Sequence, residues 1–103
     1  MLNFAFISRH VPTSEQYGIS EQHGINLVPI GDADAFTVSI DFVLQYEVKN
    51  NIEFDGVVIV HPSAAMRLCE KFLIGVFKND NRAPVGEKPQ FLATELHIYD
   101  MRS

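Results

Sequence analysis

Short apolar runs alternate with amphipathic stretches along this chain, a pattern that predicts strands and helices in turn. Residues 2–7, 25–30 and 57–60 are almost continuously hydrophobic, which is typical of strands buried on both faces. The run 73–77 predicts a fourth strand. Residues 91–99 alternate apolar and polar positions, and this alternation predicts a last strand with one exposed face.

Amphipathic stretches predict helices between these strands. Thr13 has Gln16 three residues later, which is the capping-box spacing of a helix start. A second helix is expected to begin at Asp32 or Asp34, either of which can cap it, and to end at Asn50–Asn51. Its predicted apolar face comprises Phe36, Ile40, Val43, Leu44 and Val48.

A third helix, with Ser63 as its N-cap, is expected after the third strand. Residues 79–89 contain two prolines and a glycine and predict a loop. The order β-α-β-α-β-α-β-β favours an α/β fold, namely one small, three-layer, Rossmann-like domain over residues 1–103. Its sheet is expected to be mostly parallel, with about five strands.

Composition narrows the class of protein. With 103 residues, 47% of them hydrophobic, the chain can fold alone around one core. Its single cysteine allows neither an internal disulfide nor a thiolate metal cluster, and no metal-ligand spacing appears, so no metal or other cofactor is expected. No apolar run approaches the ~20 residues of a membrane helix, and no secretory signal is recognisable. We therefore expect a cytoplasmic protein.

Charge limits the possible partners. The formal net charge is −5, and residues 32–55 carry six acidic side chains against Lys49 alone. The rest of the chain is balanced, with seven acidic and seven basic residues. Binding to duplex DNA or RNA depends on neutralising phosphates, so this acidic protein is not expected to bind it. A small anionic ligand held at one neutral or basic edge is compatible with this distribution.

Polar residues with useful chemistry follow two of the buried runs. Ser8, Arg9 and His10 come directly after the first run, and His61 and Ser63 come after the third. The carboxyl ends of parallel strands share one edge of a sheet, and open α/β sheets bind their ligands there. The sequence therefore predicts an anion-binding site built from these five residues.

Each residue of this predicted site has a functional interpretation and an ordinary structural one. Arg9 can hold a phosphate bidentately, or it can be a solvated loop residue. His10 and His61 are the candidate catalytic residues, because histidine exchanges protons near neutral pH, although a histidine at a strand end is often structural. Ser8 and Ser63 are candidate ligand-binding residues, but Ser8 can simply end its strand and Ser63 can simply cap its helix.

The run from Phe6 to His10 resembles the opening of a small CRISPR-associated family, whose first strand leads into Ser-Arg-His-Pro. That family also has a later strand followed by a proline-led, alanine-rich helix with a cysteine, which Pro62, Ala64, Ala65 and Cys69 match. The family looks like a group of ring nucleases, which cut cyclic oligoadenylate second messengers and so switch off the antiviral defence that these messengers trigger.

The resemblance implies binding and metal-independent cleavage of a cyclic oligoadenylate. A ribose 2′-hydroxyl would attack its own phosphodiester and leave a 2′,3′-cyclic phosphate, with positioning and charge stabilisation supplying most of the effect. Arg9 and the helix amides at Ser63 would hold the phosphate, and His10 or His61 would act as general base or acid. A cyclic, nearly symmetric ligand would suit a site across a homodimer axis.

Two other functions remain open. The run from Ile7 to His10 also resembles the Arg-His element of histidine phosphatases, and Val58 to His61, followed by a helix with Arg67, resembles their second histidine strand. His10 would then be the phosphoryl-accepting nucleophile. The third hypothesis is a non-catalytic nucleotide- or protein-binding module, such as a phage-encoded inhibitor, with the acidic helix over residues 35–50 as its interaction face.

Overall fold

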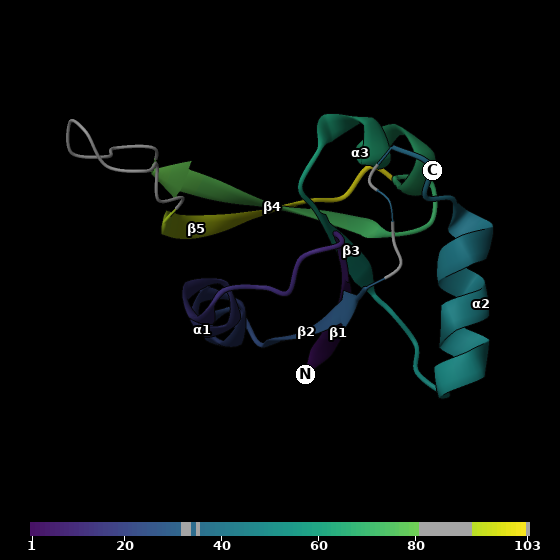
Figure 1. Ribbon diagram of the computed structural model, residues 1–103, viewed down its shortest axis with the longest axis horizontal. Coiled ribbons are helices and arrows are strands. Elements are labelled where there is room, and N and C mark those ends of the chain that lie inside the picture. The colour runs from purple at the N-terminus through teal and green to yellow at the C-terminus, as the bar shows by residue number, and fades with distance from the viewer. Residues whose placement is uncertain (32–33, 35, 81–91, 103) are drawn as a thin grey trace.

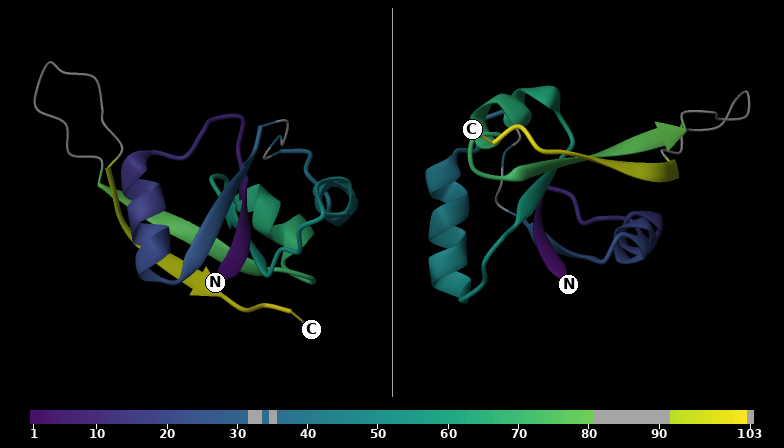
Figure 2. Two further views of the ribbon diagram at one scale, coloured as in Figure 1. Left: turned by 90° about the horizontal axis from the view of Figure 1, so that it is seen from below. Right: turned by 180° about the vertical axis from the view of Figure 1, so that it is seen from behind.

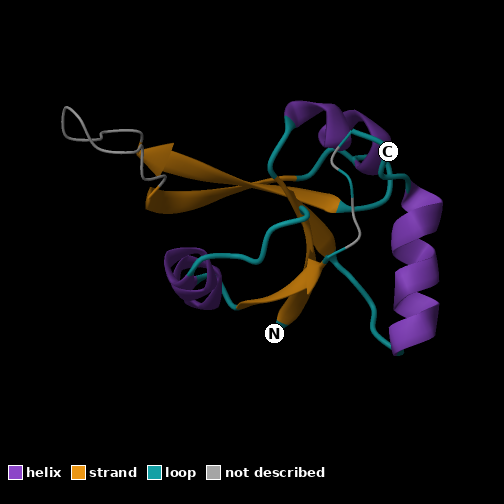
Figure 3. Cartoon of the chain, in the orientation of Figure 1, coloured by secondary structure: helices purple, strands orange, loops and turns teal. Residues whose placement is uncertain are grey.

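A computed structural model describes residues 1–31, 34, 36–80 and 92–102 of the chain. Its elements are β1 (Leu2–Ile7), α1 (Ser14–Gln22), β2 (Ile25–Ile30), α2 (Ile40–Asn50), β3 (Gly56–Ile59), α3 (Pro62–Leu68), β4 (Leu73–Asp80) and β5 (Leu92–Tyr99). The strands form one sheet in the order β2-β1-β3-β4-β5 (Figures 1 and 3). Strands β1 to β4 are parallel and β5 is antiparallel to β4, which confirms an α/β fold with a mostly parallel sheet.

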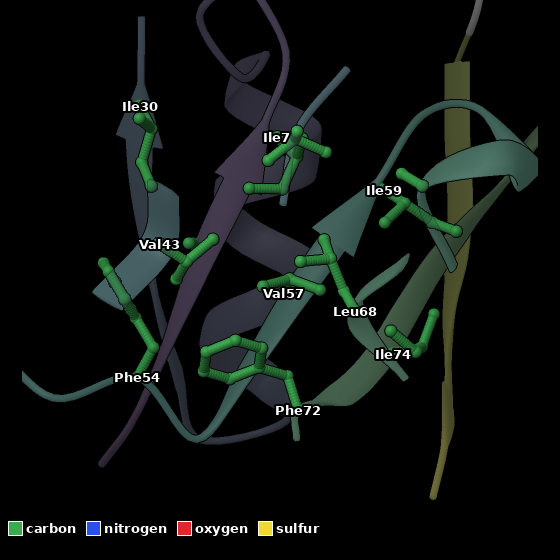
Figure 4. Packing of buried hydrophobic residues seen from close by; sticks show 12 residues of the cluster. Ile7, Ile30, Val43, Phe54, Val57, Ile59, Leu68, Phe72 and Ile74 are labelled. Atoms are coloured by element: carbon green, nitrogen blue, oxygen red, sulfur yellow. The ribbon is translucent and has the colours of Figure 1, made fainter. Parts of the chain in front are cut away.

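Successive residues of the central strands pack on opposite sides of the sheet, because side chains alternate along a strand. On one side, Ala5, Ile7 and Val57 belong to a cluster that also contains Val43 of α2 and Leu68 of α3 (Figure 4). The second cluster, on the other side, is built from β-strand residues and two side chains of α1. Its members are Phe4, Phe6, Ile25, Leu27, Val58, Phe77 and Leu96, with Tyr17, Ile19 and Leu73 packed against them.

The helices therefore divide between the two sides of the sheet, with α1 on one and α2 and α3 on the other (Figure 2). The strand β3 is buried at all of its positions, as its continuous apolar run predicted. No helix within the described part of the chain is long and apolar enough to cross a membrane.

The first helix begins where the sequence predicted. Gln16 N donates to Thr13 Oγ1 over 3.2 Å, and Thr13 N donates to Gln16 Oε1 over 2.9 Å, so the capping box is complete. The helix continues through Gly18 and ends at Gln22. Gly24 follows with φ +71°, a left-handed conformation that glycine adopts without strain.

The second helix begins later than predicted. Its N-cap is Ser39, whose side chain accepts from Phe42 N. Asp34 does not cap it, because its carboxylate accepts a hydrogen bond from Phe36 N, and such local turns compete with helix formation. Phe36 consequently lies before the helix, with 61% of its surface exposed, and Val48 is not on the buried face, since it is 85% exposed. The other proposed cap, residue 32, lies outside the described residues.

The bounds of two strands also differ from the prediction. The strand β3 runs from Gly56 to Ile59 rather than over 57–60, and its last paired residue lies opposite Ile7 of β1 and Val76 of β4. Strand β4 runs on to Asp80, so residues 79–80 of the predicted loop are paired with β5. The remainder of that loop lies outside the described residues.

Candidate functional site

The two predicted polar turns leave the sheet side by side. In β1 and β3, which are adjacent and parallel, the last residues Ile7 and Ile59 are register partners. The chain then leads from β1 into α1 on one side of the sheet and from β3 into α3 on the other. This arrangement is a topological switch point, and crevices at such points are the usual ligand sites of open α/β sheets.

The first turn is held by Ser8. This serine is buried, and its Oγ accepts a hydrogen bond from His10 N over 3.1 Å. Arg9 and His10 are exposed beyond it. We therefore interpret Ser8 as a residue that shapes the turn, while Arg9 and His10 are the side chains presented to solvent.

Arg9 is paired with a carboxylate from the loop after β2. Its Nη2 lies 3.1 Å from Asp34 Oδ2, and the two side chains are 74% and 30% exposed. The ion pair brings a third segment to this edge of the sheet, since β2 is parallel to β1 and Ile30 is the partner of Ile7.

In the second turn, His61 rather than Ser63 caps the helix α3. Its Nδ1 accepts a hydrogen bond from Ser63 N over 3.2 Å, and Ser63 Oγ lies 2.8 Å from the same nitrogen. Because histidine precedes a proline at the first helical position, its side chain reaches the next free amide as an asparagine would. When Nδ1 accepts from that amide, the hydrogen of the neutral ring is on Nε2.

This cap changes the expected phosphate contacts. The amide of Ser63, which was expected to hold the ligand, donates to His61 instead. The carbonyl of Ser63 also accepts from Arg67 Nη1 over 3.1 Å. Of the two described turns, the first supplies a cation, Arg9, and the role of His61 in the second depends on its Nε2.

Asp34 and Phe36 connect the two turns. Asp34 pairs with Arg9, and the ring of Phe36 packs on the imidazole of His61 with centroids 4.6 Å apart and planes inclined by 48°. A single short segment therefore contacts both candidate turns. The sequence analysis missed this role because it assigned the segment to a helix. The available signal was Gly31, which follows a third parallel strand, so the residues after it emerge at the same edge of the sheet.

The remaining histidines lie elsewhere. His23 is the C-cap of α1, and His97 on β5 has its Nε2 3.4 Å from Glu95 Oε2. Within the residues that the structure describes, no group of three or more His, Cys, Asp or Glu side chains is placed to hold a metal ion.

The side chains at this edge are of the types that bind anions and carry protons. One guanidinium and two imidazoles, all exposed, belong to turns that start from paired positions. No family model matches the sequence, and no curated protein or solved structure matches the chain.

Proposed function

We propose that the protein binds a cyclic oligoadenylate at the carboxyl edge of its sheet and cleaves one phosphodiester without a metal ion. The observation that carries the proposal is the switch point between β1 and β3, where the Arg9-His10 turn and the His61 turn emerge at paired positions. Their common contact with the segment of Asp34 and Phe36 supports a single site.

Arg9 would bind the phosphate by exchanging partners. An exposed ion pair such as that of Arg9 and Asp34 stabilises by only ~0–1 kcal/mol, so its loss costs little. A phosphate can accept two parallel hydrogen bonds from the guanidinium in its place. The carboxylate would then hold the arginine ready and release it when the ligand arrives.

The two histidines would divide the proton transfers. His10 would take the proton of the attacking 2′-hydroxyl while the new bond from that oxygen to phosphorus forms. The imidazolium of His61 would give its Nε2 proton to the 5′ oxygen as the bond from phosphorus to that oxygen breaks. In the imidazolium, Nδ1–H would no longer accept from Ser63 N and would donate instead to Ser63 Oγ, which lies 2.8 Å away.

The wider properties of the protein follow as parts of the same proposal. The sheet with helices on both sides would form a three-layer, Rossmann-like domain. A nearly symmetric ring would be bound across the axis of a homodimer, which would act in the cytoplasm where such messengers are made. This role is the termination of a CRISPR antiviral response.

The direct test is incubation of the purified protein with cyclic tetra- and hexa-adenylate in EDTA, followed by chromatography of the products. We expect linear products that end in a 2′,3′-cyclic phosphate.

The variant His61→Asn keeps a capping oxygen for Ser63 N but lacks a proton carrier, so we expect normal folding with at least ~100-fold slower cleavage. The matched control is His97→Asn on β5, which should cleave like the wild type.

Two results would reject this assignment. Intact rings together with no shift in melting temperature on adding them would exclude both cleavage and binding. Hydrolysis of a phosphate monoester with phosphorylation of His10 would favour the histidine phosphatase instead.

Binding without turnover is the second candidate function, and the Arg9–Asp34 ion pair favours it. The carboxylate neutralises the cation that cleavage would use to stabilise charge in the transition state. A protein of this kind would be stabilised by the ring and would leave it intact, and the His10→Ala variant would bind as well as the wild type.

A further inference from the structure

A cavity of about 510 Å³ lies next to the candidate site, where β3 ends beside the longer strand β4. Its wall includes residues 59–62 at the end of β3, Ala65 of α3, and Tyr99 and Met101 at the end of β5. The volume is within the ~300–1,000 Å³ typical of small-molecule sites. His61 belongs both to this wall and to the candidate site, so the two are continuous.

The lining is mostly apolar but contains two aromatic rings. Ile74 and Val76 of β4 line it, and the exposed Tyr99 can supply a flat, polarisable face, whereas the bordering Phe77 is buried in the second cluster. A sugar or phosphate placed here would lose its hydration without compensation. The lining therefore selects a flat, weakly hydrated group, for which stacking and burial are both favourable.

One polar side chain in the wall is oriented by its own hydrogen bond. Gln16 lines the cavity, and its Oε1 is occupied by Thr13 N at 2.9 Å as part of the capping box. The amide group cannot turn over without losing that bond. Its NH₂ has no hydrogen-bond partner among the described residues and is partly exposed, so this oriented donor is available to an acceptor on a ligand.

We infer that this cavity binds one heteroaromatic base of the nucleotide ligand, with the Gln16 amide donating to a ring nitrogen. An aliphatic chain would fit the lining but leave that donor unpaired, whereas a purine offers flat faces and acceptor nitrogens together. The identification of the ligand as a nucleotide rests on the proposed function. His61 lines the cavity and contacts Phe36, which lies two residues from the partner of Arg9, so a base in the cavity would lie near the proposed phosphate position.

The test uses adenosine, which has the base but no phosphate, titrated into the ¹⁵N-labelled full chain and followed by the backbone amide signals. We expect the amides of Val60, Ala65 and Val76 to shift. Ala65→Leu fills the cavity and should weaken adenosine binding about tenfold or more. Its matched control is Met66→Leu, one position along the same helix with an 83% exposed side chain, which should bind normally.

A second variant tests the donor itself. Gln16→Glu keeps an oxygen for Thr13 N, since glutamate is a standard capping-box residue, and therefore preserves the helix start. It replaces the NH₂ by a carboxylate oxygen, so we expect about tenfold weaker binding of adenosine. Ser14→Glu adds the same charge to the exposed start of α1, outside the cavity wall, and should leave binding unchanged.

These outcomes distinguish a failure of the inferred base binding from a failure of the proposed ring cleavage. The inference is overturned, even if rings are cleaved, when adenosine shifts none of the cavity amides. It is also overturned when adenosine binds Ala65→Leu and Gln16→Glu as tightly as the wild type. Adenosine bound in the cavity by a protein that leaves rings intact supports the inference and rejects ring cleavage alone.

Discussion

Gly56 is a position where packing alone fixes the residue type. A Cβ atom there would lie 2.6 Å from the ring of Phe4 and 2.8 Å from the carbonyl oxygen of Leu73, and Phe4 is fully buried. The ring of Phe4 and the carbonyl of Leu73 therefore occupy the space that a side chain at residue 56 would need. Gly18 differs, since a Cβ there meets nothing within 4 Å.

These two glycines give an opposed pair of predictions. Gly56→Ala should lower the free energy of unfolding by about 1–3 kcal/mol, because neither a buried ring nor a backbone carbonyl can move away cheaply. Gly18→Ala should raise it by up to about 1 kcal/mol, because alanine favours the interior of α1. Urea denaturation of the three proteins measures both, and equal effects of the two substitutions would contradict the packing described here.

The carboxyl of Asp100 gives a prediction about how stability depends on pH. Three hydrogen bonds from Arg102, two from its side chain and one from its backbone, lower the pKa of this carboxyl from 3.8 to about 2. A lowered pKa in the folded state means that the interaction stabilises the fold above pH ~4 and is lost as the pH falls toward 2. NMR titration of the carboxyl carbon should show this pKa, and Arg102→Gln should return it toward 3.8.

At the scale of elements, the sequence predicted correctly those features that depend on residues close together in the chain. The capping box of α1 was found because both of its hydrogen bonds join residues three apart. The start of α2 was misplaced because Asp34 can cap a helix or make its own turn, and its ion pair with Arg9, 25 positions away, accompanies the turn. The predicted end of β3 was one residue too long because Val60 is apolar but unpaired in the sheet, and apolar character alone does not show where pairing stops.

The capping box of α1 can be tested by removing one hydroxyl. Thr13→Ala loses the oxygen that accepts from Gln16 N and should lower the stability by about 1 kcal/mol. The neighbouring Ser14→Ala is the control, and its effect should be within about 0.5 kcal/mol because Ser14 is exposed. Thermal unfolding followed by circular dichroism is sufficient, and a larger loss for Ser14→Ala would contradict the assignment of the cap.

At the scale of the molecule, the order of strands decides which turns meet. The predicted site depended on β1 and β3 being parallel strands of one sheet, which is confirmed, and the structure shows in addition that they are neighbours with Ile7 opposite Ile59. What the sequence could not provide was the contribution of the loop after β2. Its contacts with Arg9 and His61 join residues far apart in the chain, and no local pattern marks them.

Substitution of Asp34 tests the exchange of partners at Arg9. Asp34→Asn keeps an oxygen for Phe36 N, so the turn persists, but it removes the charge that pairs with the guanidinium. Binding of inorganic pyrophosphate should tighten up to about fivefold, which is the value of a surface ion pair, and Arg9→Gln should abolish that gain. Calorimetric titration measures both, and unchanged affinity in Asp34→Asn would show that the carboxylate does not compete with the ligand.

The Arg9–Asp34 ion pair also affects how well small anions such as chloride compete for the guanidinium of Arg9. Chloride at the guanidinium would have to replace a carboxylate that is tethered to the same molecule, and a tethered competitor acts at a high effective concentration. Because the exposed pair is worth only ~0–1 kcal/mol, this competition weakens a singly attached anion by up to about fivefold, and a second attachment elsewhere can offset that loss. Arg9 would thus favour ligands that attach to the protein at more than one point.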